Sequence, residues 1–206
     1  MFNKYLADIN KDFNNKVVKS LLKQANELNV PIITDEGIHF LIHLIKIHSS
    51  KKILEIGSAI GYSSIMMALY TNAFITTIER DQEMFNLATD NIKQADLDKR
   101  IHLIHADANK IKITDTDFDL IFIDAAKASY INFFEKYSSN LKKGGLIICD
   151  NLLFKGMVEK PEQVENRNKR QLVKKIDKFN QYLVNQPDFD SRIYNLGDGM
   201  SISIKK

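Results

Sequence analysis

The sequence predicts an α/β fold in which a mostly parallel sheet carries helices on both faces and ends in an antiparallel hairpin. Short apolar runs alternate along the chain with segments of helical periodicity, as in a series of βαβ units. The runs are continuously apolar rather than alternating, which indicates strands that are buried on both faces. Two alternating runs flank "LGDG" near the C-terminus and indicate the hairpin.

Helical spacing first occurs at 10–28 and 35–48, on either side of "NVPIIT". Pro31 ends the first helix, and Thr34 or Asp35 can cap the second. The predicted strands are 52–57, 74–79, 101–106, 118–124 and 145–150. The helices that connect and follow them are predicted at 62–71, 82–95, 129–141 and about 164–185, before the hairpin in 191–206.

A length of 206 residues without linker or repeat favours a single domain, with a helical cap over 1–48 and a core over 49–206. Cys149 is the single cysteine, so no internal disulfide can form, as is usual in the cytoplasm. The N-terminus lacks the apolar core of a signal peptide, and no apolar run is long enough to span a membrane. We therefore expect a cytoplasmic protein without membrane contact.

Positive charge is concentrated in two segments, although the net charge is only +3. Residues 1–24 carry five Lys against two Asp, and residues 155–178 carry eight Lys or Arg against four acidic residues. Two interpretations are open at this point. The segments are either solvated helix faces or a docking surface for a polyanion.

Acidic side chains stand at or beside the C-terminal end of each predicted parallel strand, where ligands bind in open α/β sheets. They are Glu55, Glu79, Asp107, Asp124 and Asp150. After the first strand, a turn with Gly57 and Gly61 would let backbone come close to a ligand. Glu79 can accept both hydroxyls of a ribose or cap the next helix, and Asp107 can meet an adenine edge or cap its own loop. No GK[ST] motif is present, which argues against a nucleoside triphosphate.

The ends of the fourth and fifth strands should be neighbours and carry Asp124, Asp150 and Asn151. Two carboxylates and an amide carbonyl suit Mg²⁺ or Ca²⁺ rather than zinc; the alternative is a pair of buried or capping aspartates. Lys127 follows Asp124 in the same loop and is either a base beside the cation or a surface lysine. Cys149 lies within a buried strand and is expected to pack rather than react.

Several motifs follow one another along the chain: "EIGSAIGYSS", "IERD", "HADA", "FIDAAKASYINFF", "DNLLFKGMV" and "NLGDGMSISIKK". From about residue 31 to the C-terminus they resemble the metal-dependent O-methyltransferases of the catechol and caffeoyl-CoA type, which use S-adenosylmethionine. Within that family the chain is similar to bacterial tRNA 5-hydroxyuridine methyltransferases, on "FIDAAKxxYxNFF", "DNxLFKGxV" and the basic "KRQLVKKIDKFN". The resemblance implies a Rossmann-like class I methyltransferase fold with a seven-stranded sheet, in which 49–206 is the catalytic core.

The resemblance also implies roles for single residues. Gly57 and Ser63 would lie against the methionine part of S-adenosylmethionine, Glu79 would hold the ribose, and Asp107 with Ala108 would meet the adenine. The complete set of expected cofactor contacts is Ile33, Gly57, Ser63, Glu79, Asp107, Ala108 and Asp124. The expected Mg²⁺ ligands are Asp124, Asp150 and Asn151. Lys127 matches the general base and would be catalytic together with Asp124.

Mg²⁺ with two open positions prefers a substrate with two adjacent oxygens, which catechol and 5-hydroxyuridine both offer. Basic residues after the metal ligands would rim the site and contact tRNA phosphates. They are Lys155, Arg167, Lys169, Arg170 and Lys174. We therefore expect methylation of 5-hydroxyuridine at wobble position 34 of tRNA, giving 5-methoxyuridine. The alternative is a small catechol-like or caffeoyl-CoA-like substrate, because the same cations can rim a coenzyme A pocket. The family also implies a homodimer.

Overall fold

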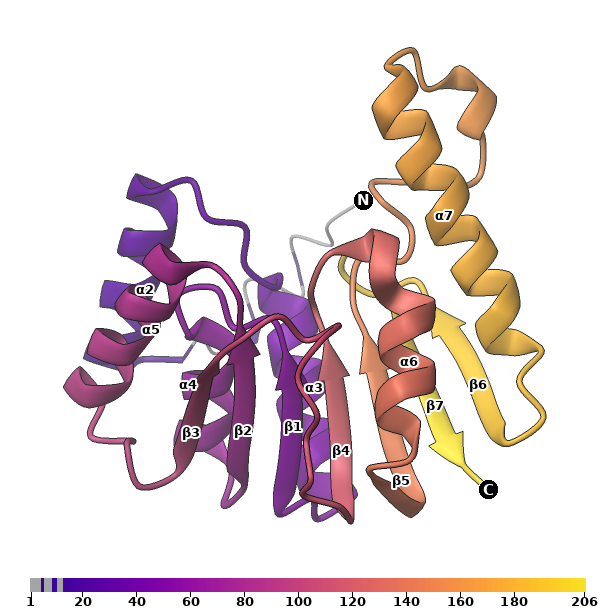
Figure 1. Cartoon of the computed structure of the whole chain (residues 1–206). Helices are drawn as coiled ribbons and strands as arrows, with labels where there is room; N and C mark the ends of the chain where they lie inside the picture. Colours follow the sequence, from indigo (N-terminus) through magenta and orange to yellow (C-terminus); the bar gives the residue numbers. More distant parts are fainter. Residues whose placement is uncertain (1–4, 6–8, 11–12) are drawn as a thin grey trace.

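The molecule is built on a seven-stranded sheet in the order β3-β2-β1-β4-β5-β7-β6 (Figure 1). The computed structural model describes residues 5, 9–10 and 13–206. The strands are β1 (Lys52–Ile56), β2 (Phe74–Glu79), β3 (Ile101–His105), β4 (Phe118–Ile123), β5 (Leu141–Cys149), β6 (Phe189–Tyr194) and β7 (Met200–Lys205). Neighbours from β3 to β5 pair in parallel, and β7 is antiparallel to both β5 and β6. The predicted fold class is confirmed.

The direction in which strands are added reverses between β1 and β4. The chain first runs outward from β1 to β2 and β3, then returns to place β4 on the other side of β1. At such a reversal the loops after the two central strands diverge and leave a crevice at their C-terminal ends. The topology therefore places the functional site beyond β1 and β4.

Helices cover both faces of the sheet, in two hydrophobic clusters. They are α2 (Lys16–Glu27), α3 (Asp35–Ile47), α4 (Tyr62–Tyr70), α5 (Gln82–Gln94), α6 (Tyr130–Ser138) and α7 (Arg167–Val184). The first four pack in one cluster and the last two in the other. Successive strand residues point to opposite faces, so Ile53 belongs to the first cluster and Leu54 to the second. No helix in the described part of the chain is both long and apolar enough to cross a bilayer.

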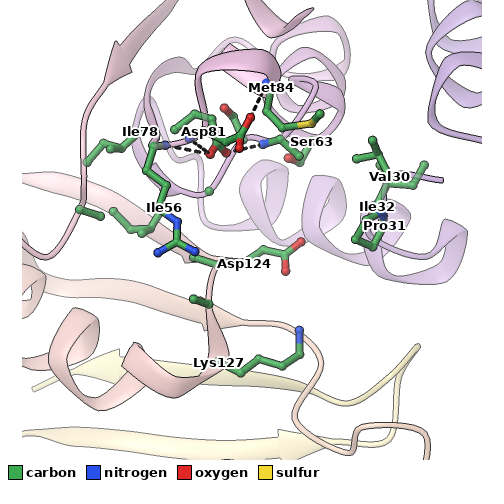
Figure 2. Close-up of a pocket in the computed structure, with 18 of the residues that line it drawn as sticks. Val30, Pro31, Ile32, Ile56, Ser63, Ile78, Asp81, Met84, Asp124 and Lys127 are labelled. Atoms are coloured by element: carbon green, nitrogen blue, oxygen red, sulfur yellow. Dashed lines mark hydrogen bonds between the residues drawn. The ribbon is translucent and has the colours of Figure 1, made fainter. Parts of the chain in front are cut away.

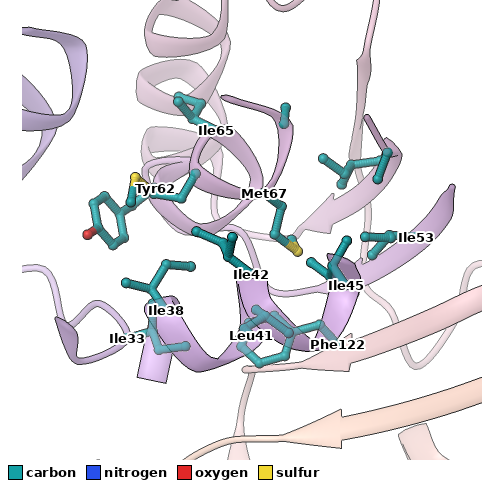
Figure 3. Packing of buried hydrophobic residues seen from close by; sticks show 14 of the residues in the cluster. Ile33, Ile38, Leu41, Ile42, Ile45, Ile53, Tyr62, Ile65, Met67 and Phe122 are labelled. Carbon is teal, nitrogen blue, oxygen red and sulfur yellow. The ribbon is translucent and has the colours of Figure 1, made fainter. Parts of the chain in front are cut away.

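The predicted apolar face of α3 forms the centre of the first cluster (Figure 3). Ile38, Leu41, Ile42 and Ile45 are all buried there. Thr34 caps this helix, because its hydroxyl accepts from the Gly37 N–H at 3.2 Å. The segment predicted as a helical cap thus supplies part of the main core.

The N-terminal boundary of the first predicted helix was wrong. The α2 helix begins at Lys16 rather than at 10, because the Asn15 side chain caps it by accepting from the Val17 N–H at 2.8 Å. Residues 13–15 are not helical, and 11–12 lie outside the described residues.

Two later boundaries also differ from the prediction. The helix predicted at 129–141 is a 3₁₀ turn, Lys127–Ser129, followed by α6, and it ends at Ser138. The β5 strand then begins at Leu141, which pairs with Phe118, four residues before the predicted start. The polar stretch "KKGG" at 142–145 hides this strand from an apolar pattern. A second 3₁₀ turn, Pro161–Gln163, precedes α7, which Asn166 caps.

Candidate active site

A cavity of about 530 Å³ opens at the C-terminal edge of the sheet (Figure 2). The loops after β1, β2, β3 and β4 form its wall, together with the segment between α2 and α3. All the residues expected to contact a cofactor line it: Ile33, Gly57, Ser63, Glu79, Asp107, Ala108 and Asp124. Seven positions that lie between residues 33 and 124 of the sequence are thus brought to one cavity.

The turn after β1 depends on Gly57 and Gly61, whose φ angles are +93° and +84°. A Cβ atom at Gly57 would lie 2.3 Å from the carbonyl oxygen of Asp124, so no side chain fits there. A Cβ at Gly61 would meet Ala88 at an ordinary 3.4 Å, so only the φ angle demands glycine there. Gly57 thus makes room for protein backbone at the end of β4, and its expected approach to a ligand stays a prediction.

Glu55 lies inside the sheet and not in the cavity wall, unlike Glu79, Asp107 and Asp124. Its carboxylate accepts hydrogen bonds from Ser63 Oγ and Thr77 Oγ1, each at 2.5 Å, and from Ser64 Oγ. Burial raises the pKa of Glu55 to about 7, although the three hydroxyls pull it down. Its expected place at the ligand-binding edge is therefore wrong.

Glu79 ties the turn after β1 to the start of α5. Its Oε1 accepts from the backbone N–H groups of Arg80 and Asp81, both at 2.8 Å, and its Oε2 accepts from the Ala59 N–H at 2.9 Å. The side chain thus fixes the loop before α5, a helix that Asp81 caps, and is also a part of the cavity wall. Oε2 keeps a second lone pair for a ligand hydroxyl.

Asp107 likewise combines a loop cap with a place in the wall. Its Oδ1 accepts from the backbone N–H and the side-chain amide of Asn109, at 2.9 and 3.2 Å. These bonds, the backbone one first, lower the pKa of Asp107. The neighbouring Ala108 is buried, and its carbonyl oxygen accepts from Tyr137 Oη at 2.7 Å.

The ends of β4 and β5 bring Asp124, Asp150, Asn151 and Lys127 together, as predicted. Lys127 Nζ donates to Asn151 Oδ1 at 2.8 Å, and the Asn151 N–H donates to Asp150 Oδ1 at 2.7 Å. Asn151 has a φ of +61°, in the left-handed region. Asp124, Lys127 and Asn151 line the cavity, whereas Asp150 lies behind them and is 2% exposed.

Two buried carboxyl groups lie close together at this end of the cavity, beside the Lys127 amine. Burial raises the pKa of Asp124, and burial together with the Asp124 charge raises the pKa of Asp150 to about 7. Asp150 Oδ2 is buried and has no hydrogen-bond partner. The oxygen donors suit a hard divalent ion. The described residues contain no group of three His, Cys, Asp or Glu side chains able to hold a metal, so a metal site here would need Asn151 as a third donor.

Two features of this region have no clear signal in the sequence. Tyr130 is buried, and its hydroxyl donates to the carbonyl oxygen of Asp150 at 3.0 Å, which fixes the end of β5. Val30 and Ile32 also line the cavity, and only the helix-breaking Pro31 between them could have drawn attention to that segment. Cys149 is buried, and burial raises the pKa of its thiol to about 12, so it packs as expected.

The basic residues after β5 gather at the N-terminal half of α7, which extends beyond the C-terminal ends of the strands (Figure 1). Lys155, Arg167, Lys169 and Lys174 are exposed. Arg170 differs, because it is half-buried and its Nε donates to the carbonyl oxygen of Val164 at 2.8 Å. Arg170 thus holds the 3₁₀ turn against the helix, and its predicted contact with tRNA stays a prediction.

Comparison with known proteins fits this geometry. The family model described as O-methyltransferase matches residues 7–206. The caffeoyl-CoA O-methyltransferase of Populus kitakamiensis is 31% identical over 85% of this chain and 77% of its own length. A candidate caffeoyl-CoA O-methyltransferase from Staphylococcus aureus has a solved structure that is 38% identical, with a TM-score of 0.93 over 98% of both chains.

A more distant solved structure, the O-methyltransferase of Bacillus cereus in complex with S-adenosylhomocysteine, shares the fold. It is 24% identical, with a TM-score of 0.82 over 98% of this chain and 96% of its own. Together, the match of the family model along nearly the whole chain and the Rossmann-like sheet show that this chain belongs to the O-methyltransferase family.

Proposed function

We propose that the chain transfers the methyl group of S-adenosylmethionine to a hydroxyl that has a second oxygen on the adjacent carbon, in a reaction that depends on Mg²⁺. The observation that supports this proposal is that one cavity contains two groups of residues, one suited to a nucleoside and one suited to a cation. The wall from Gly57 to Ala108 offers ribose and adenine contacts, and the Asp124–Asn151 end offers oxygen donors beside an amine. A methyl donor and a metal-held acceptor would therefore meet at Asp124.

The chain's own residues would bind and align the reactants. Ser63 and Asp124 would hold the amine of the methionine part, and Glu79 would accept from a ribose hydroxyl through the free lone pair of Oε2. S-adenosylmethionine is consumed as a substrate and supplies a methyl group on a positively charged sulfur, so no covalent nucleophile is needed. Holding both reactants in line supplies much of the rate.

The residues at the strand ends fit Mg²⁺, because their donors are all oxygens and one buried carboxylate oxygen is unsatisfied. Asp124, Asp150 and Asn151 would hold the ion. When bound, Mg²⁺ would lower the pKa of the acceptor hydroxyl and neutralise the two carboxylates. Lys127, whose Nζ lies 2.8 Å from Asn151 Oδ1, would take the proton of that hydroxyl.

A small catechol-like ring or a caffeoyl-CoA-like ester is the substrate class that the relatives support. The names of the Populus kitakamiensis and Staphylococcus aureus proteins both refer to caffeoyl-CoA. Such a substrate carries two adjacent ring oxygens, and in the ester the coenzyme A phosphates would meet the exposed lysines.

A tRNA substrate, 5-hydroxyuridine at wobble position 34, is the second candidate and is favoured by a different observation. Exposed Lys155, Arg167, Lys169 and Lys174 follow the proposed metal ligands and project with α7 past the cavity. A small phenol makes no use of so many cations, whereas an anticodon stem-loop has phosphates along its length. The product would be 5-methoxyuridine, and the chain would act in the cytoplasm, as a homodimer.

One assay separates these possibilities. Purified chain, S-adenosylmethionine and Mg²⁺ are incubated with caffeoyl-CoA, with catechol, and with tRNA that contains 5-hydroxyuridine, and methylated products are measured by mass spectrometry. Methylation of the phenols alone excludes tRNA, and methylation of tRNA alone excludes the phenols. No methylation of any acceptor with two adjacent oxygens would contradict the proposal.

Charge reversal on α7 adds a matched test of the tRNA candidate. Replacing Arg167 and Lys174 by Glu should weaken tRNA binding by tenfold or more, with a smaller dependence on salt, because two phosphate contacts are lost (about one unit of log–log salt slope for each). Replacing the exposed Lys93, near the end of α5, and Lys99, just before β3, by Glu makes the same change of charge away from the cavity wall and should have little effect. Equal losses in both double variants would exclude α7 as the binding face.

A further inference from the structure

A fully buried carboxylate in the centre of the sheet has no role in the reaction described so far. Glu55 lies between Leu54 and Ile56 in β1, and its own side chain is 0% exposed. Burying an ionisable group among apolar residues is costly unless its hydrogen bonds compensate. A fourth aliphatic side chain would fill the same space without that cost, so the carboxylate calls for an explanation.

Three hydroxyl groups surround this carboxylate, and all of them donate to it. Oε1 accepts from Ser63 Oγ at 2.5 Å, and Oε2 accepts from Thr77 Oγ1 at 2.5 Å and from Ser64 Oγ. Above its pKa of about 7 the Glu55 carboxylate is ionised and can only accept, and each hydroxyl has one proton. The proton of each hydroxyl is therefore directed at Glu55.

This arrangement fixes the polarity of one group in the cavity wall. Ser63 lines the cavity (Figure 2). Ser64 and Thr77 do not belong to the cavity wall. Because the Ser63 proton points inward to Glu55, only lone pairs of its oxygen are available to a ligand. The Ser63 hydroxyl therefore presents an acceptor to the cavity, and so does the Asp124 carboxylate.

We propose that Glu55 is a positioning residue that orients the Ser63 hydroxyl. In this orientation Ser63 accepts a hydrogen bond from the ammonium group of S-adenosylmethionine and cannot donate one to the carboxylate of the ligand. The inference rests on the proposed function, which places the methionine part between Ser63 and Asp124. Without this orientation Ser63 could donate to the carboxylate of the ligand as easily as accept from its ammonium. With this orientation, the favourable placement of the ligand puts its ammonium group, and not its carboxylate, beside Ser63.

A change of one atom in Glu55 tests the orientation. In Glu55→Gln an amide nitrogen replaces one carboxylate oxygen. The NH₂ group of the amide, which is a donor, then faces either Ser63 or the pair Ser64 and Thr77. Facing Ser63 forces one hydroxyl to reverse, whereas facing the pair forces two to reverse. The amide should therefore face Ser63, whose proton then turns towards the cavity and opposes the ammonium group.

The readout is the affinity for two ligands, measured by calorimetry at pH 8. One ligand is S-adenosylhomocysteine, and the other is the same molecule without its amino group. Glu55→Gln should bind S-adenosylhomocysteine about tenfold or more weakly, the loss of one hydrogen bond to a charged group. Its affinity for the deamino ligand should change less than about twofold, because the missing amine no longer senses Ser63.

Two serine variants complete the experiment. Ser64→Ala removes a hydroxyl from the same carboxylate but from outside the cavity, and should leave both affinities close to those of the unchanged chain. Ser63→Ala should lose the preference for S-adenosylhomocysteine over the deamino ligand. Adding Glu55→Gln to Ser63→Ala should cause no further loss of affinity, as expected in a double-mutant cycle if Glu55 acts through Ser63.

The proposal would be overturned if Glu55→Gln lost affinity equally for both ligands, or if it lost no affinity for S-adenosylhomocysteine. If that variant does not fold, Ser63→Ala still decides, since an unchanged preference for the amine in this variant refutes the role of Ser63. Failure of the unchanged chain to bind S-adenosylhomocysteine would instead contradict the proposed function, so the two failures are distinguishable.

Discussion

Glu55 should make the folded chain less stable as the pH rises from about 4.5 to about 7. Burial raises its pKa from 4.5 to about 7, so the folded chain holds this proton more tightly than the unfolded chain does. The resulting stabilisation is complete below the unfolded pKa and is lost as the pH rises through the folded pKa. A difference of about 2.5 pH units corresponds to about 3 kcal/mol of unfolding free energy, at roughly 1.4 kcal/mol per unit.

Urea unfolding followed by circular dichroism measures this loss. The free energy of unfolding is obtained at several pH values between 4.5 and 8, with EDTA present, for the unchanged chain and for Glu55→Gln. Asp150, whose pKa is also raised to about 7, is present in both proteins, so its contribution cancels in the comparison. The unchanged chain should lose about 3 kcal/mol more than the variant over this range. If the unfolding free energies of the two proteins changed in parallel with pH, the reasoning would be refuted, because Glu55 would then have the same pKa in the folded and unfolded chain.

Further substitutions test other parts of the structure. Gly57→Ala should lower the unfolding free energy by at least about 2 kcal/mol in urea titrations, because its Cβ would overlap the Asp124 carbonyl at a φ of +93°; a normal midpoint would contradict that contact. Lys127→Ala should lower kcat at pH 7 and lose less at pH 9 if the amine takes the proton, and an equally small loss at both would show that the acceptor ionises unaided. Asp150→Asn should abolish Mn²⁺ binding in paramagnetic resonance titrations while unfolding at a higher urea concentration in EDTA, since it removes a buried like charge; unchanged Mn²⁺ affinity would exclude this residue as a ligand. Asn15→Ala should lower the unfolding free energy by about 1 kcal/mol through the loss of the α2 cap, and an unchanged unfolding free energy would show that the cap does not stabilise the chain.

The sheet could be predicted because its strands are buried on both faces and so read as unbroken apolar runs. The same runs mark where each strand ends, and that edge is where Glu79, Asp107 and Asp124 were found in the cavity wall. Position along a strand can mislead, however. Glu55 stands two residues before Gly57 and points into the sheet, and only the partners of its carboxylate reveal this.

Other features depend on contacts between distant residues, which a single sequence does not display. Arg170 has the same local signal as its basic neighbours, yet it is held by the carbonyl oxygen of Val164. The extension of β5 back to Leu141 is fixed by pairing with Phe118, not by the polar residues that it contains. Such differences arise because tertiary hydrogen bonds override local pattern.

The close approach of Gly57 to Asp124 has a consequence for how the two ends of the cavity respond to their ligands. Asp124 packs its carbonyl group against the turn after β1, and its side chain belongs to the end of the cavity where we propose that the metal binds. A displacement of this one residue must therefore be felt by both ends. Cofactor and cation would then be thermodynamically linked, each changing the affinity of the other by the same factor, and the order in which they bind would not alter that factor.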